Sequence, residues 1–255
     1  MLEINRIYNQ DCIEGMKEID DKSIDCIICD LPYEVLNKSN ENAKWDVVIP
    51  FDKLWEQYNR IIKDNGAILL FGQGMFTAQL MMSNSSMWRY NLIWKKGNRS
   101  TGFLNAKRMP LRNHEDIVVF YKKLPTYNPQ KVIGAKNHSR GNVKKQKNQC
   151  YGKFDASVTQ DDFSGMKYPT SIIDVEKEHC KTFHPTQKPV ELISYLIKTY
   201  TNEGDLVLDN CMGSGTTAIA CIKENRNFIG FETNEEYFEK ASKRINDEKS
   251  IIKLF

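Results

Sequence analysis

The sequence predicts a doubly wound α/β domain, because short apolar runs alternate with segments of helical periodicity along most of its 255 residues. The apolar runs are continuous rather than alternating, as expected for parallel strands covered by helices on both faces. The turn at residues 30–33 follows the apolar run at residues 24–29, and a glycine-rich turn follows the run at residues 206–209. Ligands bind beyond the carboxyl ends of the strands in such sheets, so these two turns are the candidate functional positions.

Six apolar runs are expected to form strands of a parallel sheet: residues 24–29, 67–71, 91–94, 117–121, 206–209 and 228–231. Three other segments place apolar residues on one helical face and are expected to form helices. They are residues 51–63, residues 189–200 and the segment after Asn234, which is a good N-cap residue. The alternation of the two patterns is typical of a doubly wound sheet.

Charge is distributed unevenly along the chain. The net charge is +3, but residues 88–153 contain 16 Lys and Arg and two acidic residues, which gives +14 there and leaves −11 for the rest. A basic block of this size usually indicates a polyanionic partner. A solvated basic surface is the alternative that the charge count leaves open.

Residues 125–180 interrupt the pattern of strands and helices. They are rich in Lys, Asn, Gln, Gly and Ser and contain few apolar runs. A polar stretch of this length inside a compact domain is usually functional or disordered, and an inconsequential linker is the alternative. We therefore predict a core domain of residues 1–124 and 181–255 with residues 125–180 as an insertion.

The seven cysteines are scattered, and the N-terminus has no apolar stretch typical of a signal peptide, so we expect reduced thiols in a cytoplasmic protein. No apolar run is long enough to span a membrane, and no membrane partner is expected. Cys26 and Cys29 form a CxxC pair, but on a strand their side chains point to opposite faces. No second CxxC completes a zinc site, so no metal is expected and the pair is interpreted as buried core.

The glycine-rich turn runs from the predicted strand at residues 206–209 through Gly213 and Gly215 into a helix. Glycines there allow a close backbone approach to a ligand, and a helix N-terminus offers free N–H groups. Glu232 ends the next strand, where a carboxylate can accept hydrogen bonds from both hydroxyls of a ribose. Asp209 precedes the glycines and suits a cationic ligand such as S-adenosylmethionine better than a pyrophosphate. A purely structural glycine turn is the alternative.

The predicted strand at residues 24–29 is followed directly by Asp30-Leu31-Pro32-Tyr33. An exocyclic amine is a poor nucleophile, and accepting hydrogen bonds from both its N–H groups pushes the nitrogen towards a tetrahedral state. The Asp30 carboxylate and the Leu31 carbonyl can accept these bonds, and Pro32 has no N–H that would repel the amine. Tyr33 offers an aromatic face on which a base can stack. A proline turn capped by Asp30 is the structural alternative.

These motifs resemble those of the amino-methylating DNA methyltransferases of the permuted beta type. In that family an Asp/Asn/Ser-Pro-Pro-aromatic motif precedes the glycine loop, and this chain has that order with the basic block between the two motifs. His184-Pro-Thr-Gln-Lys188-Pro189 matches a family segment of the cofactor pocket, and Asn9-Gln-Asp11-Cys12 resembles the acidic turn near the cofactor adenine. The resemblance implies a Rossmann-like methyltransferase sheet, S-adenosylmethionine as cofactor, and residues 125–180 as the target-recognition region.

Two positions depart from the family pattern. Leu31 stands where proline is commonest, but this residue contributes its backbone carbonyl, so activity is expected to survive. The glycine loop has Asn210, Cys211 and Met212 between Asp209 and Gly213, where the family usually has Pro-Phe and one further residue. This loses a stiffening proline and an aromatic ring, so weaker cofactor binding is expected unless Met212 fills the same space.

The resemblance and the charge pattern together name the candidate site residues. The expected catalytic residues are Asp30, Leu31, Pro32 and Tyr33. The expected cofactor-binding residues are Asp11, Cys12, Asp30, Lys188, Asp209, Met212, Gly213, Ser214, Gly215, Thr216, Thr217, Glu232 and Thr233. Among the basic residues, Lys144, Lys145 and Lys147 are expected to contact DNA phosphates. Arg108, Arg112 and Arg140 are candidates for reading base edges, and a contact with the DNA backbone or with solvent is the alternative for each.

The implied function is methyl transfer from S-adenosylmethionine to N6 of a flipped adenine in double-stranded DNA. The initial Asp of the motif resembles the adenine enzymes more than the N4-cytosine enzymes, in which Ser is commoner. Three alternatives stay open: an N4-cytosine DNA methyltransferase, an RNA amine methyltransferase, and a nucleic-acid binder without catalysis. A homodimer and a companion restriction nuclease are further options that the sequence does not decide.

Overall fold

The computed structural model describes residues 2–34, 46–134, 165–177 and 187–252. The chain divides into two compact units, of which the first comprises Met1–Asn128 and Ser171–Phe255 and the second Pro129–Thr170. Within the second unit, β6 (Val132–Ile133) and β7 (Met166–Lys167) form an antiparallel pair. The role of residues 125–180 as a target-recognition insertion stays a prediction.

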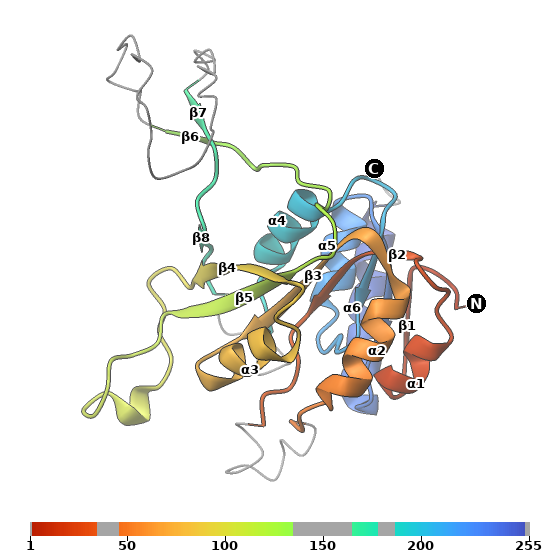
Figure 1. The fold of residues 1–255 in the computed structure, drawn as a ribbon, viewed down its shortest axis with the longest axis horizontal. Helices are drawn as coiled ribbons and strands as arrows, with labels where there is room; N and C mark the ends of the chain where they lie inside the picture. Colours follow the sequence, from red (N-terminus) through yellow and green to blue (C-terminus); the bar gives the residue numbers. More distant parts are fainter. Residues whose placement is uncertain (1, 35–45, 135–164, 178–186, 253–255) are drawn as a thin grey trace. The chain divides into compact units, whose positions relative to one another are not determined.

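The first unit is built on an eight-stranded sheet in the order β1-β10-β9-β2-β3-β5-β4-β8. Its strands are β1 (Arg6–Tyr8), β2 (Ile24–Cys29), β3 (Ile62–Gly72), β4 (Trp88–Lys95), β5 (His114–Phe120), β8 (Ile172–Asp174), β9 (Leu206–Asp209) and β10 (Asn227–Phe231). The first five strands in the spatial order run parallel, whereas β5 is antiparallel to both β3 and β4. All six predicted strands are present, and the predicted doubly wound α/β fold is confirmed (Figure 1).

The prediction that every strand runs parallel is wrong for β5, which is antiparallel to both of its neighbours, β3 and β4. Strands β4 and β5 are joined by residues 96–113, which contain only the short 3-10 helix η2 (Phe103–Asn105). A parallel pair needs a crossover connection, usually an α-helix, so the direct connection between β4 and β5 produces an antiparallel pair. Trp94 is the one fully buried residue of β4, so the expectation that both faces are covered is also wrong for this strand.

Helices cover both faces of the sheet and bury a separate core on each (Figure 1). On one face lie α1 (Cys12–Lys17), α2 (Phe51–Ile61) and α3 (Met75–Ser83), and on the other lie α4 (Val190–Tyr200), α5 (Thr216–Lys223) and α6 (Glu235–Ile252). Side chains of β2 alternate between the two cores, with Cys26 in one and Cys29 in the other. The interpretation of the CxxC pair as core residues on opposite faces is therefore confirmed.

The predicted helices are present with small changes at their ends. Helix α2 ends at Ile61 instead of Lys63, because Ile62 already pairs with Ile24 at the start of β3. The Asn234 side chain accepts a hydrogen bond from the backbone N–H of Tyr237 at 3.0 Å, as expected of an N-cap residue. Four short elements of the first unit, β1, β8, α1 and α3, were not predicted from the sequence; they are three to nine residues long.

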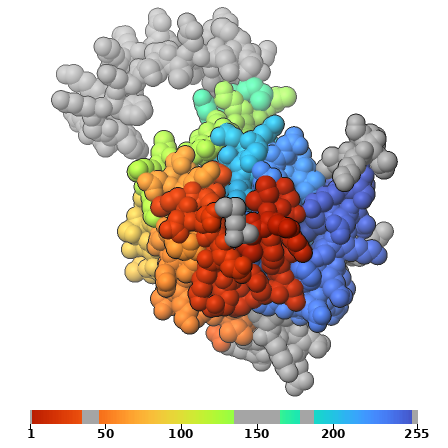
Figure 2. All heavy atoms as spheres, turned by 90° about the vertical axis from the view of Figure 1, so that its right-hand side faces the viewer, coloured from red at the N-terminus to blue at the C-terminus, as the bar shows by residue number. Residues whose placement is uncertain are grey.

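The N-terminal strand joins the C-terminal part of the sheet. β1 pairs in parallel with β10, and Figure 2 shows the N-terminal residues lying between α2 and the C-terminal helix. This pairing brings the turn after β1 next to the turns after β9 and β10. None of the helices in the described part of the chain has the length and apolar character needed to cross a membrane.

Candidate active site

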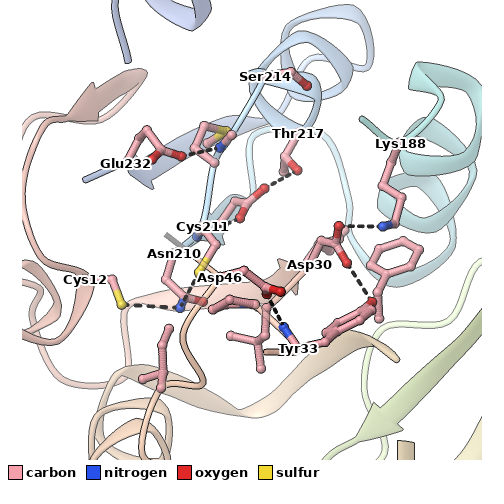
Figure 3. Close-up of a pocket in the computed structure, with 18 of the residues that line it drawn as sticks. Cys12, Asp30, Tyr33, Asp46, Lys188, Asn210, Cys211, Ser214, Thr217 and Glu232 are labelled. Atoms are coloured by element: carbon pink, nitrogen blue, oxygen red, sulfur yellow. Dashed lines mark hydrogen bonds and ion pairs between the residues drawn. The ribbon is translucent and has the colours of Figure 1, made fainter. Parts of the chain in front are cut away.

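A cavity of about 700 Å³ lies at the carboxyl ends of β1, β2, β9 and β10. Asp11, Asp30, Asp209 and Glu232 stand at or just after the ends of these four strands, and all four line the cavity. Parallel strands end at the same edge of a sheet, so segments far apart in the sequence meet there. The catalytic turn and the glycine loop therefore share one cavity, part of which is drawn in Figure 3.

The cavity is lined by most of the predicted site residues: Asp11, Cys12, Asp30, Leu31, Pro32, Tyr33, Arg112, Lys188, Asp209, Met212, Gly213, Ser214, Thr216, Thr217, Glu232 and Thr233. Gly215 and Arg108 do not line it. Gly215 has a φ of +77°, and a Cβ there would lie 3.3 Å from Ala241, so its backbone lets α6 pack closely against the loop. Arg108 is exposed on the connection between β4 and β5. The other four predicted residues, Arg140, Lys144, Lys145 and Lys147, lie outside the described residues.

The Asp30 carboxylate is held from two sides. The Tyr33 hydroxyl donates to Asp30 Oδ1 at 2.7 Å, and the Lys188 ammonium donates to Oδ2 at 2.5 Å (Figure 3). Each carboxylate oxygen keeps a further lone pair, so both can accept another hydrogen bond. Lys188 was predicted on the cofactor side of the site, and its contact with Asp30 was not predicted.

Asp46 holds the backbone of the catalytic turn. Its Oδ1 accepts hydrogen bonds from the backbone N–H groups of Tyr33 at 2.8 Å and Glu34 at 3.0 Å. One face of the Tyr33 ring packs on Phe76 of α3, with ring centroids 4.6 Å apart. These contacts fix the direction of the Tyr33 side chain relative to Asp30.

Burial and charge act together on the ionisable groups of this turn. Burial raises the pKa of Asp30 above its usual value, although the Lys188 ammonium acts in the opposite direction. For Lys188, burial acts to lower the pKa, but the Asp30 and Glu115 carboxylates outweigh it and the pKa is raised. Burial, followed by the Asp30 charge, raises the pKa of Tyr33 well above its usual value. The ion pair therefore consists of a charged ammonium beside a carboxylate that binds protons more readily than one in water.

The glycine loop is closed by carboxylates. Glu232 accepts from the Gly213 backbone N–H through Oε2 and from the Asn234 N–H through Oε1, both at 2.8 Å. Asp209 accepts from the Cys211 N–H at 3.1 Å and from the Thr217 hydroxyl at 2.5 Å. Burial raises the pKa of Glu232, and it raises the pKa of Asp209 to about 6. Two acidic groups thus border the loop, and neither forms an ion pair with a cationic side chain among the described residues.

Other contacts replace the missing proline and aromatic ring of the loop. The Asn210 side chain accepts from the Tyr58 hydroxyl at 2.5 Å, and its amide group lies 3.6 Å from the sulfur atoms of Cys12 and Cys211. Met212 is buried and packs against Gly230 of β10, where a Cβ would lie 2.1 Å from the methionine methyl group. The loop is therefore anchored by an amide and a flexible apolar side chain.

The donor set of the cavity fits S-adenosylmethionine. The ligand is cationic at sulfur and at its amino group, and Asp209, Glu232 and Asp11 supply carboxylates around the loop. Asp11 also caps α1 by accepting from the N–H groups of Ile13 and Glu14 at 2.9 and 3.1 Å, which fixes its position at the cavity wall. A cavity of this volume is large enough for a ligand of this size.

A family model described as DNA methylase, the N6/N4 type, matches residues 24–243 of the chain. The chain belongs to the N6/N4 DNA methylase family. The Type II methyltransferase M2.MboI of Moraxella bovis is 30% identical to this methylase over 97% of the chain and 89% of the relative. The Type II methyltransferase M1.MboII, also of Moraxella bovis, is 29% identical over 96% of the chain and 98% of the relative.

A solved structure supports the same assignment. The crystal structure of an M1.HpyAVI–SAM complex is 25% identical in sequence and superposes with a TM-score of 0.64, covering 94% of the methylase and 98% of that chain. The predicted resemblance and the Rossmann-like methyltransferase fold are therefore confirmed. The family uses S-adenosylmethionine as methyl donor.

Several residues of the methylase site were not predicted from the sequence. Asp46 and Tyr58 belong to no motif, and only the tertiary structure brings them to the catalytic turn and the glycine loop. Lys96, which directly follows β4, and Glu115 of the adjacent antiparallel strand β5 form a largely buried ion pair with 2.5 Å between Nζ and Oε1. The charge pattern could have indicated Glu115, because it is one of two acidic residues in the basic block of residues 88–153.

Proposed function

We propose that this methylase transfers a methyl group from S-adenosylmethionine to N6 of adenine in duplex DNA. The observation that carries the proposal is the shared cavity, in which the Asp30 carboxylate of the catalytic turn faces the same space as Asp209 and Glu232 of the glycine loop. The carboxylate that would accept a hydrogen bond from the target amine thus lies beside a pocket for a cationic methyl donor. The relatives are Type II methyltransferases, which supports site-specific modification of DNA as the setting.

The cofactor would lie along the glycine loop. Asp209 and Glu232 would face its cationic amino group and its ribose, and the backbone around Gly213 allows close approach. Asp11 and Cys12 would border its adenine. When bound, S-adenosylmethionine supplies an electrophilic methyl group on a positively charged sulfur.

The catalytic turn prepares the amine. The Asp30 carboxylate accepts a hydrogen bond from one N–H of the amine, and the Leu31 carbonyl accepts from the other. Both hydrogen bonds raise the electron density on the nitrogen and orient its lone pair for attack. The turn therefore contributes by positioning and electrostatics. The new bond from the nitrogen to the methyl carbon would form as the methyl–sulfur bond breaks, with the electron pair of that bond left on a neutral sulfur. The nitrogen would then lose one proton, which an ionised Asp30 could accept. Tyr33 and Lys188 both donate to Asp30 and so favour its ionised form.

Duplex DNA is the proposed substrate. The Asp30 carboxylate lies inside the cavity, so a base of the duplex must leave the helix to reach it. Arg112 lines the cavity and donates to the Gln73 side chain at 2.8 Å, so it places a cation at the edge of the site. Residues 125–180, with Lys144, Lys145 and Lys147, are proposed to bind the duplex around the flipped base. A homodimer stays a prediction.

The test uses labelled S-adenosylmethionine and unmethylated duplex DNA, followed by digestion and separation of the nucleosides. We expect label in N6-methyladenine with the wild-type protein and none with Asp30→Ala. Label in N4-methylcytosine would keep the mechanism and overturn the base assignment. Labelling of structured RNA but not of DNA would overturn the substrate, and cofactor binding without transfer to any polymer would support a non-catalytic binder.

A further inference from the structure

Four ionic side chains, two of them buried and two largely buried, form a row that ends at the catalytic carboxylate. Lys96 Nζ lies 2.5 Å from Glu115 Oε1, Glu115 Oε2 lies 3.3 Å from Lys188 Nζ, and Lys188 Nζ lies 2.5 Å from Asp30 Oδ2. Their side chains are 3%, 14%, 8% and 19% exposed in this order. The charges alternate along the row, and their sum is zero.

The row is assembled from four separate parts of the chain. Lys96 directly follows β4, Glu115 lies in β5, Lys188 stands just before α4, and Asp30 follows β2. All four side chains line the same cavity. Lys188 alone would be enough to neutralise Asp30. Neutralisation of Asp30 therefore does not explain why Glu115 and Lys96 are also present.

Glu115 restricts the position of the Lys188 ammonium. A lysine side chain has a flexible four-carbon stem, so one contact with Asp30 leaves several rotamers available. Glu115 holds the ammonium from a second side, and the ammonium also lies over the Phe71 ring, 4.9 Å from its centroid. Lys96 neutralises the far oxygen of Glu115 and lies over the Trp94 ring at 5.3 Å.

We propose that Glu115 is a positioning residue for methyl transfer, which acts through Lys188 to hold the Asp30 carboxylate oriented towards the amine while preserving its basicity. The inference rests on the proposed function, since it concerns how Asp30 accepts the amine. Lys188 binds one oxygen and Tyr33 the other, so the carboxylate cannot rotate without breaking a bond. Glu115 shares the Lys188 charge, so Asp30 keeps its basicity for the amine while Lys188 holds it in place.

The electrostatic effects of the two neighbours on Asp30 are opposite in sign. The Lys188 ammonium lowers the pKa of Asp30, and the Glu115 carboxylate raises it. Besides Lys96, the ionisable groups around Asp30, Glu115 and Lys188 are Tyr33, Asp209, Cys29 and Lys177. All of them are kept in the variants compared first, so a change in the pH profile is assigned to the group that is replaced.

The experiment compares Glu115→Gln, Glu115→Asp and Lys188→Met with the wild type. For each protein, kcat and the KM for DNA and for S-adenosylmethionine are measured across pH. Asp174→Asn is the matched control, because Asp174 forms an exposed ion pair with Lys95, the residue next to Lys96. Calorimetric binding of S-adenosylmethionine to each variant gives a readout that does not depend on turnover.

For Glu115→Gln we expect kcat to fall by about tenfold, as is typical when the partner of an active-site ligand is removed, with both KM values little changed. The acidic limb of the kcat profile reports the group that must be ionised, here Asp30. It should move to lower pH in Glu115→Gln and to higher pH in Lys188→Met. Glu115→Asp should restore part of kcat, and Asp174→Asn should match the wild type.

A purely structural role for Glu115 gives different results. Removing one charge from a buried row destabilises the fold, so thermal unfolding of the apo-protein is measured for each variant. The double variant Lys96→Met/Glu115→Gln restores the charge balance and should recover stability. If its kcat stays low and its acidic limb stays shifted, the positioning role is supported. Recovery of wild-type kcat together with stability overturns it.

The proposed function and this inference can fail separately. If the wild type transfers no methyl group to DNA, the proposed function fails. If the wild type is active, Asp30→Ala is inactive, and Glu115→Gln has the wild-type kcat and pH profile, only the inference fails. Shifts of the acidic limb in the same direction for Glu115→Gln and Lys188→Met would also overturn it.

Discussion

The Asp209 side chain is buried at the end of β9, and burial raises its pKa to about 6 even though Thr217 and Cys211 donate to it. A carboxylate with this pKa changes charge close to physiological pH. The neighbouring Glu232 is partly buried, and this burial raises its pKa as well. Within the described part of the chain, neither acid forms an ion pair with an ammonium group, unlike Asp30. These two acids therefore form the part of the site that suits a cationic ligand.

At the residue scale, we predict that S-adenosylmethionine binding weakens as the pH falls below about 6. Protonation of Asp209 removes the charge that attracts the ligand, so the dissociation constant should rise up to tenfold for each pH unit. Calorimetry between pH 5 and 8 measures this. Asp209→Asn should bind weakly at every pH and lose most of the dependence, and an unchanged dependence in this variant would contradict the assignment.

The same pKa has the opposite effect on the stability of the apo-protein. The folded state binds the Asp209 proton more readily than the unfolded chain between pH 3.8 and about 6. The contribution of this group to stability therefore increases as the pH falls through that window. Comparison of wild-type and Asp209→Asn unfolding at pH 4.5 and 7 serves as the control for the binding measurement.

The glycine loop that connects β9 and α5 contains residues that depart from the family pattern. Met212 of the glycine loop packs on Gly230 of β10, and the backbone N–H of Met212 donates to the Phe231 carbonyl at 2.8 Å. The loop and the strand thus position each other. Because Met212 replaces a stiffer arrangement with a flexible side chain, the contact is sensitive to small changes in volume.

At the element scale, we predict that Gly230→Ala weakens cofactor binding more than it destabilises the fold. The new Cβ would lie 2.1 Å from Met212 Cε and 3.0 Å from Ile7 Cγ2, so the methionine must move and take the loop with it. Overpacking of this kind typically costs about 1–3 kcal/mol. Calorimetry and thermal unfolding of Gly230→Ala and of Met212→Ala/Gly230→Ala measure both effects. Failure of the double variant to recover binding would contradict this explanation.

A second prediction at this scale concerns the connection between β4 and β5, which carries Arg108 and Arg112. Replacing both residues with Gln should weaken duplex binding and reduce the slope of log binding constant against log salt by about one for each phosphate that is no longer neutralised. Fluorescence anisotropy across salt concentrations measures the slope. Lys223→Gln, which removes a cation paired with Glu248 on the α5–α6 side, is the control. An equal slope in the double variant and the control would contradict a role in DNA binding.

At the scale of the whole molecule, cofactor binding is coupled to the stability of the folded protein, because the cavity is formed by segments from both ends of the chain. Asp11, Asp30, Lys188 and Glu232 reach it from different strands and helices of the first unit. A ligand bound there holds these segments together. We therefore predict that S-adenosylmethionine at one hundred times its dissociation constant stabilises the folded protein by about 2.7 kcal/mol.

Thermal unfolding with and without the cofactor measures this stabilisation, which corresponds to roughly 2–4 °C per kcal/mol for a chain of this size. Asp209→Asn at the same ligand concentration should show a smaller shift, because less ligand is bound. A shift that equals the wild-type value in this variant would show that the ligand stabilises the protein from another site.

The order of the motifs, the alternation of strands and helices, and the residues of the two turns were all predictable from the sequence. They depend on local rules: apolar runs form buried strands, and turns after parallel strands collect at one edge of the sheet. For this reason most of the predicted site residues line one cavity. The same rules do not define strand direction, and the absence of a crossover helix between β4 and β5 made that part of the prediction wrong.

Only the tertiary structure decided which charged side chains meet. Lys188 was expected beside the cofactor but donates to Asp30, and Glu115 and Lys96 extend that ion pair across β5 and β4. A charged side chain that is buried must find partners, but its partners lie far away in sequence and depend on strand order and register. The sequence by itself therefore determined the class of chemistry at the two turns, and the packing of the sheet determined the electrostatic environment in which that chemistry takes place.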